Sequence, residues 1–166
     1  MRRTARLESR VLFVGVDAIA DNLRDASRRA SPNSLFGRLA LEDAPGELSG
    51  LADRLTVLFP WGSLLGALSL PDRHGLSRLR AICRPGAEVR FLFELDSDPR
   101  VLERRYLEAG FALAGRRISV EEARALPTTW AKKLGFSGRP RIFCEFQGRA
   151  IGHTAPTGAA PGVHTS

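Results

Sequence analysis

The feature that most constrains the fold is an alternation of apolar, strand-like runs with amphipathic helical stretches. Residues 11–17 (VLFVGVD) form a continuous apolar run that ends in an acid, which predicts a buried parallel strand. In the stretch that follows, Ile19, Leu23, Ala26 and Ala30 recur at spacings of four, three and four, which places them on one face of a helix. A strand followed by a helix in this way predicts an α/β sheet.

The same alternation continues through the rest of the chain. Further strands are expected at 34–41, 55–61, 88–95, 111–119 and 141–148. Helices are expected at 64–70, 76–83, 99–109 and 119–126. His74 is expected in a turn, and Gly86 in RPGAE is expected to end a helix in the left-handed conformation. Ser119 and Glu122 have the spacing of a capping box.

The length of 166 residues suits one domain, which we place at residues 1–149. The remaining segment, 150–166, is rich in Gly, Pro, Ala and Thr and is expected to be a disordered tail. Residues 31–33 (SPN) separate the first helix from the next strand. Neither an internal repeat nor a second domain is indicated by the sequence.

The charge is unusual for a globular chain of this size. Lys and Arg number 25 against 18 Asp and Glu, which gives a net charge of +7 and a pI near 10.8. Such a pI favours a nucleic-acid binder, although a generally basic protein is the alternative. Lys132 and Lys133 are the only lysines, and the many arginines can hold phosphate through two parallel N–H bonds and stack on bases.

Other classes of protein find little support in the sequence. No apolar run approaches the roughly 18 residues that a membrane helix needs, so we expect no membrane association. Cys83 and Cys144 lie in apolar contexts without metal-like spacing, which indicates reduced core residues of a cytoplasmic protein. We find no motif for hydrolysis or metal chemistry and expect no metal.

Acidic residues follow two of the expected strands. Asp17 can accept hydrogen bonds from ribose hydroxyls, as an acid at the end of a strand does in nucleotide-binding sheets, or it can cap the next helix. Glu42 can meet an adenine amino group or lie in a solvated loop. Because the ends of parallel strands converge at one sheet edge, these acids and the FPWG turn at 59–62 can share one site.

The two tryptophans lie in unusual surroundings. Trp61 sits between Pro60 and Gly62, which fix a turn and leave the ring uncovered, so it either stacks a base or covers the sheet edge. Trp130 is followed by cations that suit RNA docking but can equally form a solvated surface. These cations are Lys132, Lys133, Arg139 and Arg141.

Four segments resemble the aminoglycoside-resistance methyltransferases of the Kam and Npm type. They are GVDAIADNLRDASRRA, LADRLTVLFPWGSLL, LRAICRPGAEVRFL and LPTTWAKKLGF, within a resemblance that runs from about residue 11 to 149. FPWGSLL and TTWAKKL are specific, whereas GVDA and RPGAE recur across many class I methyltransferases. The resemblance implies a Rossmann-like class I methyltransferase sheet with helices on both faces. It also implies methylation of N1 of adenine 1408 in 16S rRNA of the 30S subunit, by a monomer that uses S-adenosyl-L-methionine.

The resemblance also assigns roles to residues. The positions matching the target-base pocket, where two tryptophans sandwich a flipped adenine, are Phe59, Pro60, Trp61, Thr128 and Trp130. Thr128 stands where many relatives have serine. The positions assigned to the cosubstrate are Asp17 at the ribose, Glu42 near the adenine, Leu41 and Ser63; Ser63 also matches a position lining the target pocket. The residues expected to dock the RNA backbone are Lys132, Lys133, Arg139 and Arg141.

One departure from the family pattern concerns the N-terminal segment. Class I methyltransferases begin with a strand and a glycine-rich turn that approaches the methionine part of the cosubstrate, whereas MRRTARLESR contains no glycine. In the family's sheet that strand lies between those matching 11–17 and 55–61, so its loss leaves two unpaired edges or forces them together. Either the reading frame begins upstream of Met1, or the chain is a truncated, catalytically impaired RNA-binding paralogue or fragment.

Overall fold

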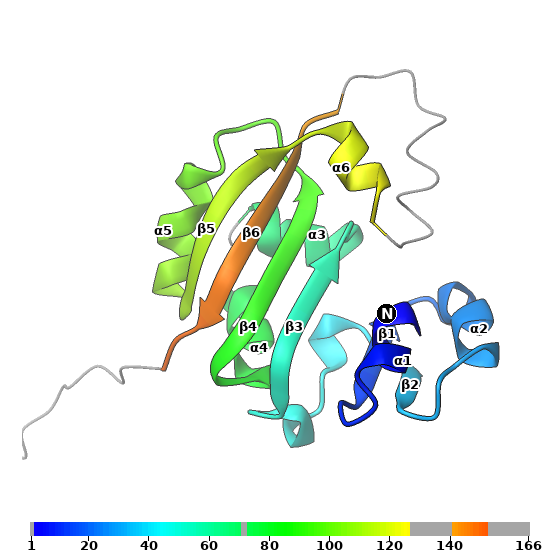
Figure 1. The fold of residues 1–166 in the computed structure, drawn as a ribbon. Helices are drawn as coiled ribbons and strands as arrows, with labels where there is room; N and C mark the ends of the chain where they lie inside the picture. Colours follow the sequence, from blue (N-terminus) through cyan, green and yellow to red (C-terminus); the bar gives the residue numbers. More distant parts are fainter. Residues whose placement is uncertain (1, 71–72, 127–140, 153–166) are drawn as a thin grey trace, which may run out of the picture.

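Two β-sheets lie side by side in the computed structural model, which describes residues 2–70, 73–126 and 141–152 (Figure 1). The smaller sheet pairs β1 (Phe13–Asp17) with β2 (Ser34–Arg38) in parallel. The larger sheet has the strand order β3 (Ala52–Leu58), β4 (Cys83–Glu94), β6 (Phe143–Ala150) and β5 (Phe111–Ile118). The chain is thus a mixed α/β protein, as the alternating sequence pattern predicts.

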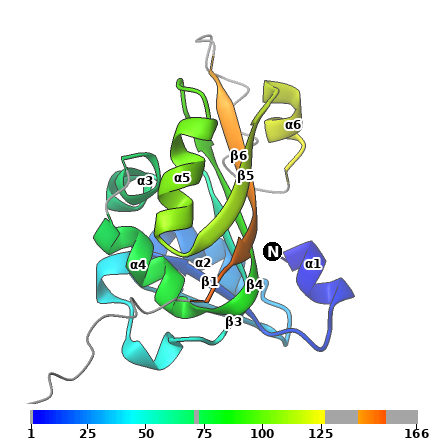
Figure 2. The same cartoon turned by 90° about the vertical axis from the view of Figure 1, so that its left-hand side faces the viewer.

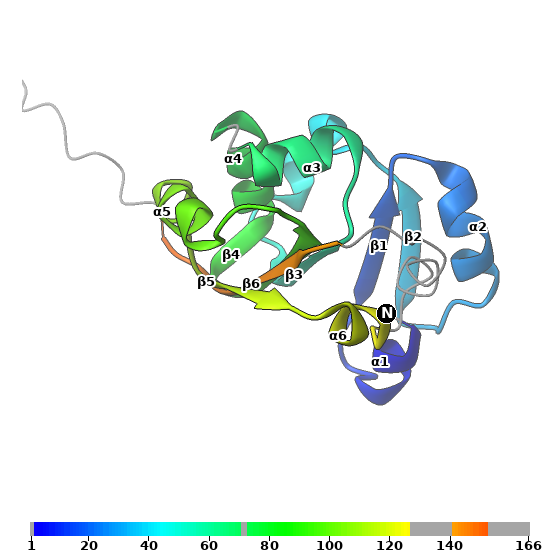
Figure 3. The same cartoon turned by 90° about the horizontal axis from the view of Figure 1, so that it is seen from above.

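Helices cover the four-stranded sheet unequally. Three helices lie on one face, namely α3 (Gly62–Ser69), α4 (Arg73–Ile82) and α5 (Arg100–Glu108) (Figure 2). The short helix α6 (Val120–Arg124) lies on the other face, near one end of the strands (Figure 3). β3 and β4 run parallel, whereas β6 is antiparallel to both of its neighbours, β4 and β5. This arrangement places the last strand, β6, inside the sheet and leaves β5 at its edge.

The main hydrophobic core fills the space between the four-stranded sheet and the three helices. Its largest buried rings contact one another edge to face or stacked, and they are Phe91, Phe93, Tyr106, Phe111 and Phe146. The hydroxyl of Tyr106 donates to the carbonyl of Leu68 in α3 at 2.8 Å. The buried polar tip therefore has a partner, so this large side chain is accommodated without an unsatisfied group.

A second, smaller hydrophobic cluster lies on the opposite face of the same sheet. It consists of Phe59, Leu92, Ile118, Ala123 and Phe143, with Leu58, Val120 and Leu126 packed against it. Side chains alternate between the two faces of a strand. Leu92 therefore points to this cluster, while its neighbours Phe91 and Phe93 point to the main core.

The smaller sheet is far less covered. Its helices are α1 (Arg2–Leu7) and α2 (Ala20–Arg28), and α2 contains no buried residue. Val14 and Val16 of β1 are 54% and 52% exposed. The Asn33 side chain donates to the carbonyls of Ala5, Glu8 and Val11 at 2.8–3.0 Å and ties the residues before β1 to the start of β2.

Within the described residues, β1 pairs only with β2, and β3 pairs only with β4. In this part of the chain, each sheet therefore has a strand with a partner on one side only. This strand is β1 in the smaller sheet and β3 in the larger one. This is the first of the two outcomes that the sequence leaves open for the sheet, since the edges have not been forced together. In Figure 3 the smaller sheet lies on the side of β3 that is turned away from β4.

Several element boundaries differ from those expected. The strand expected at 34–41 ends at Arg38, and the residues after it form 3-10 helices, Leu41–Asp43 and Gly46–Leu48. The strand expected at 55–61 begins at Ala52 and ends at Leu58, because Phe59 takes a positive φ that leaves the extended conformation.

The turn expected at 84–88 is wrong, because β4 begins directly after α4. Gly86 does take the expected positive φ, 83°, but it does so within the strand. The pairing register shifts between Ala52 and Arg54 beside it, so the glycine accommodates an irregularity of the ladder rather than a turn. His74 is not in a turn either, since α4 begins at Arg73.

Other expectations at the level of single residues are met. Ser119 and Glu122 form a capping box, and Gly110 ends α5 with a φ of 87°. Cys83 and Cys144 are buried free thiols. The folded region extends past the expected boundary at 149, since the N–H of Ile151 donates to Gly110 O at 2.8 Å. Residues 153–166 of the predicted tail lie outside the described residues.

The described residues contain no helix that is both long and apolar enough to cross a membrane. In the same part of the chain, no group of three or more His, Cys, Asp or Glu side chains is arranged to hold a metal ion.

Candidate active site

The carboxyl ends of β2 and β3 meet through a contact between two polar side chains. Glu42 follows β2, and Ser63 lies in the first turn of α3, which follows β3. A hydrogen bond from the Ser63 hydroxyl is the main cause that lowers the pKa of the Glu42 carboxyl, which is therefore charged at neutral pH. Arg78 of α4 donates to the backbone carbonyl of Glu42 and holds the same segment from the other side. The structure thus joins the two strand ends that the sequence predicts to converge.

Asp17 closes β1 at the same edge of the smaller sheet. Its carboxylate accepts the N–H of Ile19 at 2.8 Å and the side-chain amide of Asn22 at 3.1 and 3.2 Å. The residue at the N-cap of α2 is Ile19, so the interpretation of Asp17 as the helix cap is wrong. A carboxylate has roughly four acceptor positions, so three bonds leave capacity for a further donor such as a ribose hydroxyl.

Leu41 directly precedes Glu42 in the 3-10 helix that follows β2. The backbone of Asp17 accepts the N–H of Leu39 at 3.0 Å, which fixes the start of the segment that carries Leu41 and Glu42. The Leu41 side chain is half-buried and packs against the main core. An apolar side chain at this position can contact the face of a planar ring whose polar groups bind the neighbouring acids.

Trp61 is presented by a turn with two left-handed residues. Phe59 has a φ of 51° and Gly62 a φ of 61°. A bulky residue in the left-handed region costs about 1–3 kcal/mol and persists only where its surroundings hold it. Pro60 follows Phe59, and the side chain of Trp61 is 50% exposed. The Trp61 side chain is therefore half-exposed, which agrees in part with the uncovered ring that the flanking proline and glycine predict.

Most of the other predicted site residues belong to residues 127–140. Thr128, Trp130, Lys132, Lys133 and Arg139 lie outside the described residues. Arg141 is described, and its guanidinium lies 3.4 Å from the carboxylate of Glu94, with 32% of the side chain exposed. The Arg141 guanidinium is thus already in an ion pair within the protein.

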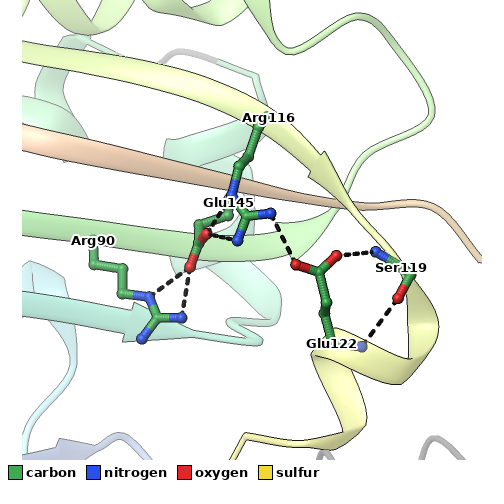
Figure 4. Close-up of polar contacts among 5 residues, drawn as sticks. All are labelled: Arg90, Arg116, Ser119, Glu122 and Glu145. Atoms are coloured by element: carbon green, nitrogen blue, oxygen red, sulfur yellow. Dashed lines mark hydrogen bonds and ion pairs between the residues drawn. The ribbon is translucent and has the colours of Figure 1, made fainter.

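Sequence reasoning missed a buried ion network on the four-stranded sheet (Figure 4). The side chain of Glu145 on β6 is only 1% exposed, and it accepts Arg90 at 2.5 Å and Arg116 at 2.6 Å. Arg116 also donates to Glu122 at 2.9 Å, and Glu122 closes the capping box with Ser119. The signal in the sequence was a lone acid inside the apolar run FCEF at 143–146.

Opposing effects act on the carboxyl of Glu145. Burial raises its pKa, but hydrogen bonds from Gln147, Arg90 and Arg116 together hold the pKa below the ordinary value. The group therefore stays ionised and fully paired in the interior, which makes this network a rigid part of the fold.

The described residues fit one end of a nucleoside-containing cosubstrate. Asp17 and Glu42 offer carboxylates to ribose and adenine donors, Leu41 offers an apolar contact, and Ser63 is hydrogen-bonded to Glu42. Among residues 2–12, which precede β1, none is a glycine. This part of the chain therefore supplies no glycine-rich turn for the methionine end of such a molecule.

Comparisons with known proteins agree on one family. The family model "NpmA: 16S rRNA (adenine(1408)-N(1))-methyltransferase" matches residues 1–98. A 16S rRNA (adenine(1408)-N(1))-methyltransferase of Streptoalloteichus tenebrarius is 32% identical and aligns over 84% of this chain and 76% of its own. One from Escherichia coli is 26% identical over 88% and 80%. The crystal structure of the 16S rRNA methyltransferase KamB has a TM-score of 0.73 at 29% identity, over 91% and 82%.

Proposed function

The chain belongs to the 16S rRNA (adenine(1408)-N(1))-methyltransferase family, and we propose that it methylates N1 of adenine 1408 in 16S rRNA within the 30S subunit. S-adenosyl-L-methionine is the methyl donor in this proposal, and aminoglycoside resistance is the consequence. The observation that carries the proposal is the half-exposed Trp61 ring on a left-handed turn, two residues before Ser63 and its bond to Glu42.

Stacking on Trp61 addresses the main energetic obstacle to this reaction. An enzyme cannot reach N1 of an adenine that is held inside a helix, so the base must leave the stack, which costs a few kcal/mol. Each aromatic face that stacks a base contributes about 1–3 kcal/mol. Trp61 provides one face, and in our proposal Trp130 provides the second, so that the two together offset the cost.

The chemistry asks the protein for positioning rather than for a strong base. N1 of adenine carries a lone pair and no proton, so no residue has to remove one. When bound, the cosubstrate supplies a methyl group on a positively charged sulfur. Trp61 holds the ring, Phe59, Pro60 and Thr128 line its pocket, and Asp17, Leu41, Glu42 and Ser63 hold the nucleoside of the donor. Holding the reacting atoms close and in line contributes most of the rate acceleration.

Docking on the ribosomal subunit is assigned to basic residues. Lys132, Lys133, Arg139 and Arg141 remain our candidates from the sequence. Arg28 and Arg29, at the end of α2 and exposed, add positive charge on the side of the smaller sheet. We place the protein in the cytoplasm as a monomer acting without a metal. Because phosphate contacts release counterions, binding to 30S subunits should weaken steeply as salt rises.

A methyl-transfer assay tests the proposal directly. The protein is incubated with 30S subunits and methyl-labelled S-adenosyl-L-methionine, and label at position 1408 is located by a primer-extension stop. Subunits with guanine at 1408 are the matched control, since N1 of guanine carries a proton and should not be labelled. Absence of label at adenine 1408 would refute the proposal. The alternative of a non-catalytic RNA-binding remnant has no support in the relatives, which are named as enzymes.

A further inference from the structure

The smaller hydrophobic cluster includes or contacts a residue near each of the two tryptophan-bearing segments. Phe59, one of its members, is two residues before Trp61. Leu126, which packs against the cluster, is the last described residue before 127–140, the segment that carries Trp130. The two segments are far apart in the sequence, yet each is joined to this one cluster through a residue next to it.

Phe143 of β6 holds the first of these segments. Its ring is 2% exposed and meets the ring of Phe59 edge to face, with centroids 5.7 Å apart and planes at 88°. The N–H of Phe59 donates to Leu92 O at 2.7 Å. Together these contacts keep Phe59 in the left-handed conformation from which Pro60 and Trp61 continue.

The buried ion network holds helix α6, which precedes the second segment in the sequence. Glu145 lies two residues after Phe143 on β6, so both side chains are on the same face of the sheet. Glu145 binds Arg116, Arg116 binds Glu122 of α6, and Glu122 closes the capping box (Figure 4). Ala123, the next residue of α6, is fully buried in the cluster. The position of α6, and with it of Leu126, is therefore fixed by charge at its start and by packing along its length.

We propose that Phe143 and Glu145 are positioning residues for the target base, because they fix the Phe59 turn and helix α6 relative to each other. Both are too deeply buried to touch the substrate, so they act through Phe59 and α6. The inference rests on the proposed function, since it concerns the same site. It adds that the geometry of that site is caused by packing in the smaller hydrophobic cluster, and not only by the two tryptophan-bearing segments themselves.

The sharpest test compares two phenylalanines of β6 that point to opposite faces. Phe143→Leu removes a ring from the smaller cluster, and Phe146→Leu removes one from the main core, where Phe146 is also fully buried. Melting temperatures of both variants are measured first, and kinetics are then compared at a temperature where both are folded. We expect Phe143→Leu to lower kcat on 30S subunits about tenfold through lost stacking, with little change in KM. Phe146→Leu should keep both constants close to those of the unmodified chain.

A second pair of variants avoids the core and tests the network alone. Glu122→Gln keeps an acceptor for the capping box but removes the charge that pairs with Arg116. Its matched control is Glu108→Gln, which weakens the exposed Arg104–Glu108 pair on α5. We expect Glu122→Gln to lower kcat severalfold, by less than Phe143→Leu, and Glu108→Gln to leave it unchanged.

Intrinsic fluorescence gives a readout that is independent of activity. Trp61 and Trp130 are the only tryptophans in the chain, so acrylamide quenching reports on these two segments alone. Phe143→Leu and Glu122→Gln should change the quenching, and the two controls should not. Equal effects of Phe143→Leu and Phe146→Leu on kcat and on quenching would overturn the inference. If the unmodified chain fails to methylate 30S subunits, the proposed function fails, while the quenching comparison still decides the inference.

Discussion

The two sheets of this protein differ sharply in how completely they are built. In the larger sheet, β4 and β6 are each paired on both sides, and Phe91, Leu92, Cys144 and Phe146 are fully buried. In the smaller sheet, β1 has one partner strand within the described part of the chain, α2 buries no residue, and Val14 and Val16 are more than half exposed. The larger sheet therefore has a closely packed core, whereas the smaller sheet is exposed along the strand β1.

The difference matters because the two halves of the proposed site belong to different sheets. The turn with Trp61 rests on the larger sheet through Phe59 and Phe143. Asp17, which is assigned to the cosubstrate, lies at the end of the exposed strand β1. The proposed surface for the target base thus has a rigid support, whereas one of the acids assigned to the cosubstrate depends on the less covered region.

The largest expected effect is on backbone hydrogen exchange. Global unfolding of a domain costs about 5–15 kcal/mol, and local opening of weakly covered elements costs far less. We therefore expect the amides of β4 to exchange at least roughly 1,000-fold more slowly than those of β1. Exchange measured by NMR or mass spectrometry checks this. Equal protection of β1 would break the comparison, because it would mean that the open edge is covered in solution.

A substitution in each half of the site should separate the two functions. Trp61→Ala removes one stacking face, worth about 1–3 kcal/mol, so methyl transfer should fall roughly 10- to 100-fold. Affinity for S-adenosyl-L-methionine should not change. Asp17→Asn removes the charged acceptor at the end of β1, and we expect weaker cosubstrate affinity with unchanged binding to 30S subunits.

Calorimetry for the cosubstrate and filter binding for the subunit measure the two affinities separately. Trp61→Phe is the matched control, since it keeps an aromatic face and should retain most of the activity. A loss of cosubstrate affinity in Trp61→Ala equal to that in Asp17→Asn would show that the two halves are not separate.

The next prediction concerns the free energy of unfolding. It makes the same substitution, valine to threonine, once in each sheet. Val89→Thr places a hydroxyl at a site that is 2% exposed on β4, which should cost about 1–3 kcal/mol of unfolding free energy. Val16→Thr places the same group on the exposed face of β1, where about 0.5 kcal/mol or less is expected. Urea denaturation of both variants measures the difference. Similar costs would indicate that Val16 is buried in solution.

The sequence predicted the order of elements well, because the strands and helices carry their own periodicity. EVRFLFEL lies in the strand expected at 88–95, and its alternate residues Val89, Phe91 and Phe93 are buried. Local rules failed where distant contacts decide. RPGAE contains a proline and a glycine, which predict a turn, but pairing of Cys83 with Ala52 draws the segment into β4.

The site shows the same division between local and distant causes. The exposure of Trp61 follows from its immediate neighbours Pro60 and Gly62, so the sequence could predict it. The bond between Ser63 and Glu42, and the packing of Phe143 on Phe59, join residues that are remote in the chain. No local pattern specifies such pairs, and the roles assigned to Thr128 and Trp130 rest on the family resemblance.

The smallest expected effect is a dependence of stability on pH that differs between the two regions. Glu145, in the larger sheet, and Glu42, after β2, both have a pKa below the ordinary value. A carboxyl whose pKa is lowered by folding stabilises the native state above its unfolded pKa of about 4.3. That contribution is lost as the pH falls through the lower, folded value.

The buried Glu145 should carry most of this dependence, because exposed ion pairs contribute little. We expect Glu145→Gln to lower the melting temperature at pH 7, and the difference from the unmodified chain to be smaller at pH 3, because the carboxyl is then mostly protonated in the unfolded state, whose pKa is about 4.3. Glu42→Gln is the matched control and should melt like the unmodified chain at both pH values, because Glu42 is exposed. If Glu145→Gln were as destabilised at pH 3 as at pH 7, packing of the side chain rather than its charge would hold the network together.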